Sequence, residues 1–256
     1  MPEHHLNPDM HLDYKEFVRY NRHVMTNGIG EEGQLAIKSS HVLIIGLGGL
    51  GCPASQYLTA SGVGTITLID HDIIESSNLQ RQVLFTEQDI GEQKVDIAQL
   101  RLQSLNPLIK VNGITKSILN INLSELLNDV DVVLDCTDNA TTRHFINATC
   151  VKNKVKLVSA SAIQSQGQLI SFDFASPDSP CYQCVFPSAD NQDLNCSTSG
   201  VFSPVLGVLG SLQATEALRL ILGKTNNLNT LSLFDAWGMA FKRFAVTKDP
   251  KCICCH

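Results

Sequence analysis

The sequence has little of several features that define other protein classes. Aromatic residues make up only 6% of the 256 residues, and 25 acidic side chains outnumber 19 basic ones. Nucleic-acid backbones require basic surfaces, so we expect no nucleic-acid partner. The N-terminal segment MPEHHLNPDMHLDYKEF lacks the apolar core of a signal peptide. The most apolar helix-length stretch, 204–222, is interrupted by Gln213, Glu216 and Arg219. It predicts a buried helix rather than a membrane span, in a cytoplasmic protein.

Disulfide bonds are not expected, because the nine cysteines are odd in number and accompany no secretion signal. Four of them form two C-x-x-C pairs, Cys181 with Cys184 and Cys252 with Cys255. This spacing is typical of a structural Zn²⁺ site in which four thiolates close a tetrahedron. A redox C-x-x-C is the alternative, and Cys254 or His256 could replace one of the ligands. We expect the metal to fasten the C-terminus to the loop before the long helix.

A glycine-rich turn follows a short apolar run, VLIIGLGGLG at residues 42–51. It matches G-x-G-x-x-G between an expected strand and an expected helix, the setting in which this motif binds nucleotides. We expect Gly46 to permit the tight turn and Gly51 to allow close helix packing. Gly48 and Gly49 would let backbone N–H groups approach phosphate. The loop alone does not distinguish a redox dinucleotide from a triphosphate.

Expected strands and helices alternate up to residue 160, which predicts a doubly wound parallel sheet. The expected strands before that point are 42–45, 65–69, 109–114, 130–134 and 155–160, and the helices are 53–61, 94–105, 124–128 and 140–151. Beyond it, the expected strands 167–174, 230–235 and 240–246 suggest an antiparallel end. We therefore expect a Rossmann-like, mostly parallel α/β sheet that continues into an antiparallel C-terminal part with a zinc site. A single domain over 1–256 is expected, comprising a helical segment (12–40), a nucleotide-binding half (41–160) and a second half (161–256).

Polar and charged residues follow several of these strands, on the side where open α/β sheets bind ligands. Asp70 ends the second strand at the spacing of a ribose-binding acid, and the passage after it contains Asp72, Ser77, Asn78, Arg81 and Lys94. A lone arginine or lysine is more often a solvated surface charge. Two cations beside a nucleotide loop, however, favour a triphosphate over a nicotinamide dinucleotide.

The segment Cys136-Thr137-Asp138-Asn139 follows the strand at 130–134, close to where the glycine loop should lie. Asp138 or Asn139 could cap the next helix. An acid that faces phosphates also implies a Mg²⁺ ion between them. Both roles are compatible with this position.

Taken together, these features resemble the ubiquitin-activating-like adenylyltransferases of bacteria, the ThiF/MoeB/HesA family, over about residues 17–255. The resemblance rests on an ordered set of motifs: R-Y-N-R at 19–22, G-L-G-G-L-G at 46–51, Asp70, S-N-L-Q-R-Q at 77–82, Lys94, C-T-D-N at 136–139 and both cysteine pairs. It implies ATP-dependent adenylation of the C-terminal glycine carboxylate of a ubiquitin-like sulfur-carrier protein that ends in Gly-Gly. The carrier would bind the second half of the chain.

The resemblance also implies roles for individual residues. ATP would be bound by Gly49, Asp70, Asn78, Arg81, Lys94 and Asp138, with Asp138 holding Mg²⁺. Arg22 would reach the phosphates of the neighbouring subunit in a homodimer, and the paired cysteines would bind zinc. Cys196, in the irregular segment 177–200, matches a sulfur-handling cysteine, although a lone cysteine is more often inert. We expect a separate sulfur donor, such as a cysteine desulfurase, since no rhodanese-like extension is present.

The pathway stays open between thiamine and molybdopterin synthesis, because the chain carries features similar to each branch. C-Y-Q-C, N-C-S-T-S-G and L-F-D resemble the thiamine branch, whereas R-Y-N-R and G-L-G-G-L-G-C-P-A-S-Q-Y-L resemble the molybdopterin branch. His23 stands where glutamine is common. Three alternatives remain: an NAD-dependent oxidoreductase, a zinc-stabilised binding scaffold, and a tRNA-modifying dehydratase of the same superfamily.

Overall fold

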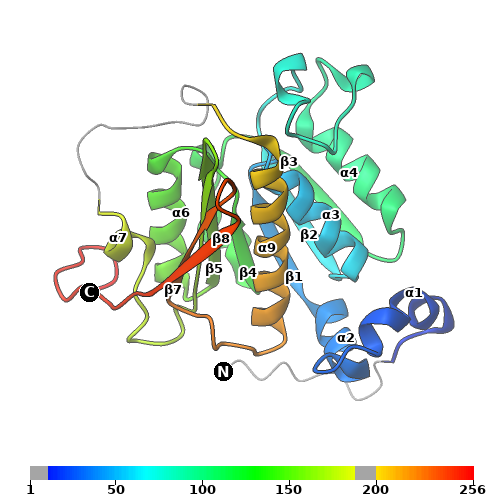
Figure 1. Cartoon of the computed structure of the whole chain (residues 1–256). Coiled ribbons are helices and arrows are strands. Elements are labelled where there is room, and N and C mark those ends of the chain that lie inside the picture. Colours follow the sequence, from blue (N-terminus) through cyan, green and yellow to red (C-terminus); the bar gives the residue numbers. More distant parts are fainter. Residues whose placement is uncertain (1–10, 188–199) are drawn as a thin grey trace.

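The computed structural model describes residues 11–187 and 200–256, and Figure 1 shows how its elements are arranged. The strands are β1 (His41–Ile45), β2 (Thr65–Asp70), β3 (Lys110–Thr115), β4 (Val132–Asp135), β5 (Lys156–Ile163), β6 (Gln166–Phe172), β7 (Thr230–Asp235) and β8 (Ala240–Ala245). The α-helices are α1 (Tyr14–Val24), α2 (Gly30–Ser39), α3 (Gly51–Ser61), α4 (Lys94–Leu105), α5 (Leu123–Leu126), α6 (Ala140–Asn153), α7 (Tyr182–Val185) and α9 (Ser203–Ile221).

The strands form one mixed sheet in the order β3-β2-β1-β4-β5-β6-β7-β8. Pairing is parallel from β3 to β5 and antiparallel from β5 to β8. The switch follows from a two-residue turn, in which Gln164 has a positive φ of 52° and Ile163 pairs with Gln166. Such a turn leaves no room for a crossover helix. The predicted fold class is confirmed.

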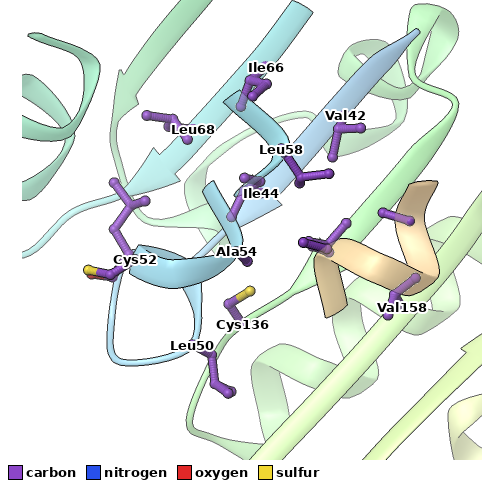
Figure 2. Packing of buried hydrophobic residues seen from close by; sticks show 14 of the residues in the cluster. Val42, Ile44, Leu50, Cys52, Ala54, Leu58, Ile66, Leu68, Cys136 and Val158 are labelled. Carbon is purple, nitrogen blue, oxygen red and sulfur yellow. The ribbon is translucent and has the colours of Figure 1, made fainter. Parts of the chain in front are cut away.

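Helices cover both faces of the parallel part of the sheet, and the alternation of side chains along β1 shows how. Val42 and Ile44 pack into a core beneath α3, α4 and α9, whereas Leu43 and Ile45 pack into a second core beneath α6. Successive strand residues point to opposite faces, so a continuous apolar run fits a strand buried on both sides. Figure 2 shows part of the first core, including Leu58 of α3.

One expected element differs from the structure. The segment 12–40 is two helices, because the chain turns between α1 and α2 at Gly28, whose φ is +85°. The long apolar helix was correctly expected to be buried: α9 packs against α3 and against strands β4, β5 and β6. Within the described residues, no helix has the length and apolar character needed to cross a membrane.

Helix α1 has its polar side turned inward. Glu16 and Tyr20 are buried, whereas an outer row of apolar side chains is exposed, namely Tyr14, Phe17, Val18 and Met25. The helix is fixed to the C-terminal end of α4: the Arg19 guanidinium donates to the carbonyl of Leu105, and Asn106 Nδ2 donates to Tyr20 Oη at 2.9 Å. The exposed apolar row is thus left without a partner within the described residues.

Candidate nucleotide site and cysteine cluster

A cavity of about 230 Å³ lies at the carboxyl ends of the parallel strands. It sits where β1 and β4 are neighbours and the strand order reverses, the point at which open α/β sheets bind ligands. Ten of the residues expected at the site line it: Gly46, Gly48, Gly49, Asp70, Asp72, Asn78, Arg81, Lys94, Asp138 and Asn139.

The glycine loop has little space for side chains. Gly46 has a φ of +94°, and a Cβ there would lie 2.9 Å from the carbonyl oxygen of Cys136. A Cβ at Gly51 would lie 1.9 Å from the Gly46 oxygen, which explains why the first turn of α3 must begin with glycine. At Gly48, by contrast, the nearest atom would be 3.9 Å away. The backbone at Gly48 is therefore open to a ligand in the cavity.

Asp70 has a structural role within the site. Its Oδ2 accepts a hydrogen bond from the N–H of Leu47 at 2.6 Å, and its Oδ1 accepts one from the N–H of Asp72 at 2.9 Å. The carboxylate thereby ties the glycine loop to the end of β2. Its predicted contact with a ribose stays a prediction.

The cations expected near phosphate are both in the cavity wall. Lys94, buried at the start of α4, places its Nζ 2.8 Å from Oδ2 of the half-exposed Asp72. Arg81 donates to the Ser77 carbonyl at 2.9 Å, and its half-buried side chain lines the cavity. The amide of Asn78 accepts a hydrogen bond from the Glu75 N–H, which fixes the turn that presents Arg81. Arg81 and Lys94 thus bring two cationic side chains to this wall, and that of Lys94 is paired with Asp72.

Two roles were considered for Asp138 and Asn139, the N-cap of the next helix and the Mg²⁺ ligand, and the structure assigns the cap to Asn139. Asn139 is the N-cap of α6 and accepts from the N–H of Thr142 at 2.9 Å. Asp138 is exposed at the cavity, and its carboxylate has no hydrogen-bond partner within the described part of the chain. Buried Asp135 holds this segment in place by accepting from the N–H and hydroxyl of Thr137 at 3.1 and 2.7 Å. A carboxylate held in this way fits a divalent cation that prefers oxygen ligands.

Some expected residues are not brought to the cavity. Arg22 is exposed on α1 and does not line the cavity. Ser77 is exposed and donates to the Glu75 carboxylate at 3.2 Å. Gly51 lies beneath the loop and does not line the cavity. Cys196 lies outside the described residues.

The sequence analysis gave no individual role to several residues that line the cavity, among them Gln82, Lys116 and Arg143. Gln82 was within reach, since it ends the S-N-L-Q-R-Q segment. Arg143 stands in the first turn of α6, and a cation there reads as a solvated surface charge. Its guanidinium instead donates to the Thr137 carbonyl at 2.6 Å. Lys116 follows β3, and no sequence pattern around it indicates a site residue.

A second cavity, of about 400 Å³, adjoins the first over the antiparallel strands β5 to β8. Asp138, Arg143 and Ala162 line both cavities, so the two meet at these residues. Apart from Asp138 and Arg143, the charged residues that line the second cavity are Asp235 of β7 and Lys242 of β8, and the other lining residues are uncharged.

The four paired cysteines converge, although about seventy residues separate the pairs. The Sγ atoms of Cys181 and Cys252 lie 3.6 Å apart, those of Cys184 and Cys255 3.4 Å, and all four lie within 4.8 Å of one another. Four thiolates around Zn²⁺ at about 2.3 Å would stand about 3.8 Å apart. The donor set therefore fits a tetrahedral metal site, which would join α7 to the C-terminus.

The remaining cysteines of the described chain are not part of this cluster. Cys254 Sγ accepts a hydrogen bond from Asn147 Nδ2 at 3.2 Å and lies beside the four ligands rather than among them. Cys52, Cys136 and Cys150 are buried, and burial raises the pKa of each thiol, to about 12 for Cys52. These three thiols are therefore protonated and unreactive at neutral pH.

The fold and site define a class: a Rossmann-like nucleotide-binding α/β protein whose sheet continues into an antiparallel part stapled by a four-cysteine cluster. Comparison with known families identifies it further. The model of the ThiF family matches residues 20–254, and the chain belongs to this family.

Its relatives include two proteins of Escherichia coli K12. The chain is 40% identical to the molybdopterin-synthase adenylyltransferase, with 95% of this chain and 98% of that protein covered. It is 42% identical to the sulfur carrier protein ThiS adenylyltransferase, with 95% and 97% covered. It is also 41% identical to adenylyltransferase and sulfurtransferase MOCS3 of Culex quinquefasciatus, but spans only 56% of that protein's length.

Solved structures confirm the fold. Escherichia coli MccB with ATP superposes with a TM-score of 0.77 at 25% identity, over 97% of this chain and 77% of that one. MccB with succinimide gives a TM-score of 0.78 at 24% identity, over 93% and 74%.

Proposed function

We propose that this protein is an ATP-dependent adenylyltransferase that acts on the C-terminal glycine carboxylate of a small ubiquitin-like sulfur-carrier protein and releases pyrophosphate. The names of its close relatives support this activity. The single observation that carries the proposal is the junction of the two cavities at Asp138, Arg143 and Ala162. One cavity suits a nucleotide, and the other suits an extended peptide that arrives at its α-phosphate.

The chemistry requires positioning more than proton transfer. A terminal carboxylate has a pKa of roughly 3.5, so it is already a nucleophile at neutral pH. Attack on the α-phosphate forms the acyl–adenylate and breaks the bond to the β-phosphate, so negative charge develops on pyrophosphate. Lys94, Arg81 and the open backbone at Gly48 surround the space where that charge would lie. Their preorganised positive charge would lower the barrier by electrostatic stabilisation.

Asp138 is the residue that would hold Mg²⁺ beside the phosphates. Bound there, the ion would neutralise phosphate charge and orient the triphosphate. The carboxylate is exposed at the junction and makes no other hydrogen bond within the described residues. The segment before it is fixed by Asp135 and the guanidinium of Arg143. Its position therefore needs little rearrangement to meet a metal-bound nucleotide.

The second cavity would receive the carrier's C-terminal tail, and the surrounding sheet would receive its folded part. The exposed aromatic side chains at the β7–β8 end support this assignment. Phe202 and Trp237 stack with ring centroids 4.8 Å apart, and Trp237 and Phe241 are 73% and 53% exposed. Exposed aromatic rings gathered on one surface are typical of protein interfaces.

The apolar row of α1 would pack against a second copy of the chain, and Arg22 would reach the partner's phosphates. Arg22 is exposed on the same helix as Tyr14, Phe17 and Val18, which supports this arrangement. Mixing an Arg22→Ala protein with an Asp138→Ala protein tests it. Heterodimers would contain one complete site, so activity should recover to about a quarter of wild type after subunit exchange. An inactive mixture would refute a site shared between subunits.

The cysteine cluster would hold Zn²⁺ as a closed structural site, with no open position for chemistry. We also propose that the protein is cytoplasmic and that the sulfur comes from a separate donor protein, such as a cysteine desulfurase. Thiamine and molybdopterin synthesis both stay open as pathways, as does a covalent role for Cys196.

One experiment tests the function most directly. The full chain is incubated with ATP–Mg²⁺ and each endogenous carrier that ends in Gly-Gly, and the intact mass of the carrier is measured. One carrier should gain the mass of AMP, and the same carrier with its terminal carboxylate converted to an amide should not. NAD should neither replace ATP nor raise the melting temperature, whereas ATP–Mg²⁺ should raise it. If no carrier gains AMP, the proposed function is wrong.

A further inference from the structure

Helix α6 lies between the nucleotide cavity and the cysteine cluster, and it packs against α7 (Figure 1). Its N-cap, Asn139, directly follows Asp138 at the cavity. Two turns further along, buried Asn147 contacts both cysteine segments. Its Oδ1 accepts from the N–H of Tyr182 at 2.8 Å, and its Nδ2 donates to Cys254 Sγ at 3.2 Å. One rigid helix thus joins the two sites.

Tyr182 provides a second and more direct connection. It stands between Cys181 and Cys184 at the start of α7, and its side chain is buried. The phenol oxygen accepts a hydrogen bond from the guanidinium of Arg143. The ring also contacts His144 edge-on, with centroids 5.3 Å apart. The side chain therefore reaches from the first cysteine pair to the first turn of α6.

Arg143 continues this connection to the Asp138 segment. Its Nη2 donates to the carbonyl of Thr137 at 2.6 Å, and Thr137 is the residue directly before Asp138. The carboxylate of Asp138 has no hydrogen-bond partner of its own among the residues that the structure describes. Its position therefore depends on the contacts that hold its neighbours, and one of these leads back to Tyr182.

A second buried tyrosine makes the comparison informative. Tyr20 of α1 also uses its phenol oxygen as an acceptor, but its partner is the neutral amide of Asn106, at 2.9 Å. Neither of these two residues lines a cavity in the described part of the chain. The partner of Tyr182, by contrast, is a cation in the walls of both cavities. The contact of Tyr182 with Arg143 thus connects the cysteine cluster to a binding site, whereas that of Tyr20 only joins helices.

We propose that Tyr182 is a positioning residue that links the cysteine cluster to the nucleotide site, because it holds Asp138 in place through Arg143. This inference rests on the proposed function for the identity of the ligand, ATP–Mg²⁺. A metal held by the four thiolates would fix Tyr182, and a metal-bound nucleotide would fix Asp138. Binding at either site should therefore strengthen binding at the other by the same factor.

The first test measures the Kd for ATP–Mg²⁺ by calorimetry, with the full chain and without any carrier. Tyr182→Phe keeps the ring and removes the hydroxyl, so it should retain its zinc and weaken nucleotide binding about fivefold, the lower end of typical coupling between sites. In an Asp138→Ala background, the same substitution should change the Kd by less than about twofold, because the group through which Tyr182 acts is gone. A purely structural tyrosine would weaken binding equally in both backgrounds.

The second test measures the reverse effect, the affinity for zinc in competition with a zinc-selective chelator. Saturating ATP–Mg²⁺ should tighten zinc binding about fivefold in the wild type. It should do the same in Tyr20→Phe, the matched control that removes another buried phenol hydroxyl. Tyr182→Phe and Asp138→Ala should show no such tightening. Should Tyr182→Phe lose its zinc, the wild type and Asp138→Ala decide the question, since both keep the phenol.

Equal zinc affinity with and without nucleotide in the wild type would overturn the inference, as would a Tyr182→Phe protein that binds ATP–Mg²⁺ as tightly as wild type. Failure of the proposed function gives a different result. A chain that shows the linkage but adenylates no carrier would refute that function and support this inference. A chain that adenylates a carrier without the linkage would do the opposite, and a chain that binds no ATP would overturn both.

Discussion

The ammonium group of Lys94 lies 2.8 Å from the carboxylate of Asp72, and the backbone N–H of Lys94 donates to the carbonyl of the same residue at 3.1 Å. The lysine side chain is 6% exposed, and that of the aspartate is 53% exposed. A buried cation at the start of a helix is disfavoured by burial and by the helix dipole. Asp72 offsets both effects until phosphate arrives.

Replacing Lys94 should therefore reduce activity, whereas replacing Asp72 should reduce stability. Lys94→Gln should leave the fold intact and reduce ATP–pyrophosphate exchange by about a hundredfold or more. Asp72→Asn should lower the free energy of unfolding by about 1–2 kcal/mol, less than for a fully buried pair because Asp72 is half exposed. ATP should then stabilise Asp72→Asn more than wild type. Urea unfolding with and without ATP–Mg²⁺ measures this, and an equal gain in both proteins would contradict the assignment.

Two glycines of the same loop should respond differently to alanine. Gly51→Ala would place a Cβ 1.9 Å from the Gly46 carbonyl oxygen, a backbone atom that has no room to move. It should cost at least about 3 kcal/mol or prevent folding. Gly48→Ala meets no atom within 3.9 Å, so it should fold normally and raise the KM for ATP. Circular dichroism and exchange kinetics separate the two, and equal folding defects would refute this difference.

Asp138 offers the sharpest test of the metal assignment. Asp138→Ala should abolish carrier-dependent ATP–pyrophosphate exchange and leave the melting temperature within about 1 °C of wild type, since surface substitutions rarely alter stability. Asp138→Asn should retain a small activity that needs more Mg²⁺. Near-normal exchange in the alanine variant would rule out the proposed role.

The cysteine cluster predicts about one zinc ion per chain in protein purified without chelator. Cys255→Ser should lose the metal and melt earlier, because the C-terminus is then no longer joined to α7. Cys254→Ser is the matched control, since Cys254 lies outside the four ligands, and it should keep its zinc. Zinc content measured by mass spectrometry shows whether Cys255, and not Cys254, is a metal ligand. Loss of metal in the control, or much less than one zinc in wild type, would show that the ligand set is wrong.

The free energy of unfolding should decrease as the pH falls below neutral, because His41 is protonated more readily in the unfolded chain. Burial lowers the pKa of His41, although the carbonyl of Asp129, 2.9 Å from its Nδ1, raises it in part. The neutral imidazole is therefore favoured in the folded chain, and its contribution to stability is present above the unfolded pKa of about 6.5. It is lost as the pH falls through that value towards the lower folded pKa. Urea unfolding between pH 8 and pH 5 should show this decline, and His41→Gln should reduce it. An unchanged slope in the variant would exclude His41 as the cause.

Much of the fold follows from local sequence. The bounds of α4 and β7 agree with the expected ranges, because apolar spacing defines them and Asn106-Pro107 stops α4. The break between α1 and α2 was missed, since one turn at Gly28 interrupts an otherwise continuous helical pattern. Strand periodicity and turn length together predicted where pairing becomes antiparallel.

The candidate site was predictable where motifs carry it and less so where burial does. Asp138 and Lys94 belong to short sequence patterns, and those patterns predict their roles in binding Mg²⁺ and phosphate. Arg143 is at the site because of its contact with the Thr137 carbonyl, and the local sequence around Arg143 does not indicate that contact. For Asp70, the motif gave the position, but the hydrogen bond to Leu47 emerged only from the structure.

Helix α4 begins at Lys94 in the nucleotide cavity and ends at Leu105, whose carbonyl binds Arg19 of α1. Its twelve residues span about 18 Å as one rigid rod. In the proposed dimer, α1 delivers Arg22 to the other subunit's phosphates. The two nucleotide sites would then be linked through α4 and α1. ATP binding at one site would change the position of Arg22 at the other site, so the dimer would bind ATP cooperatively.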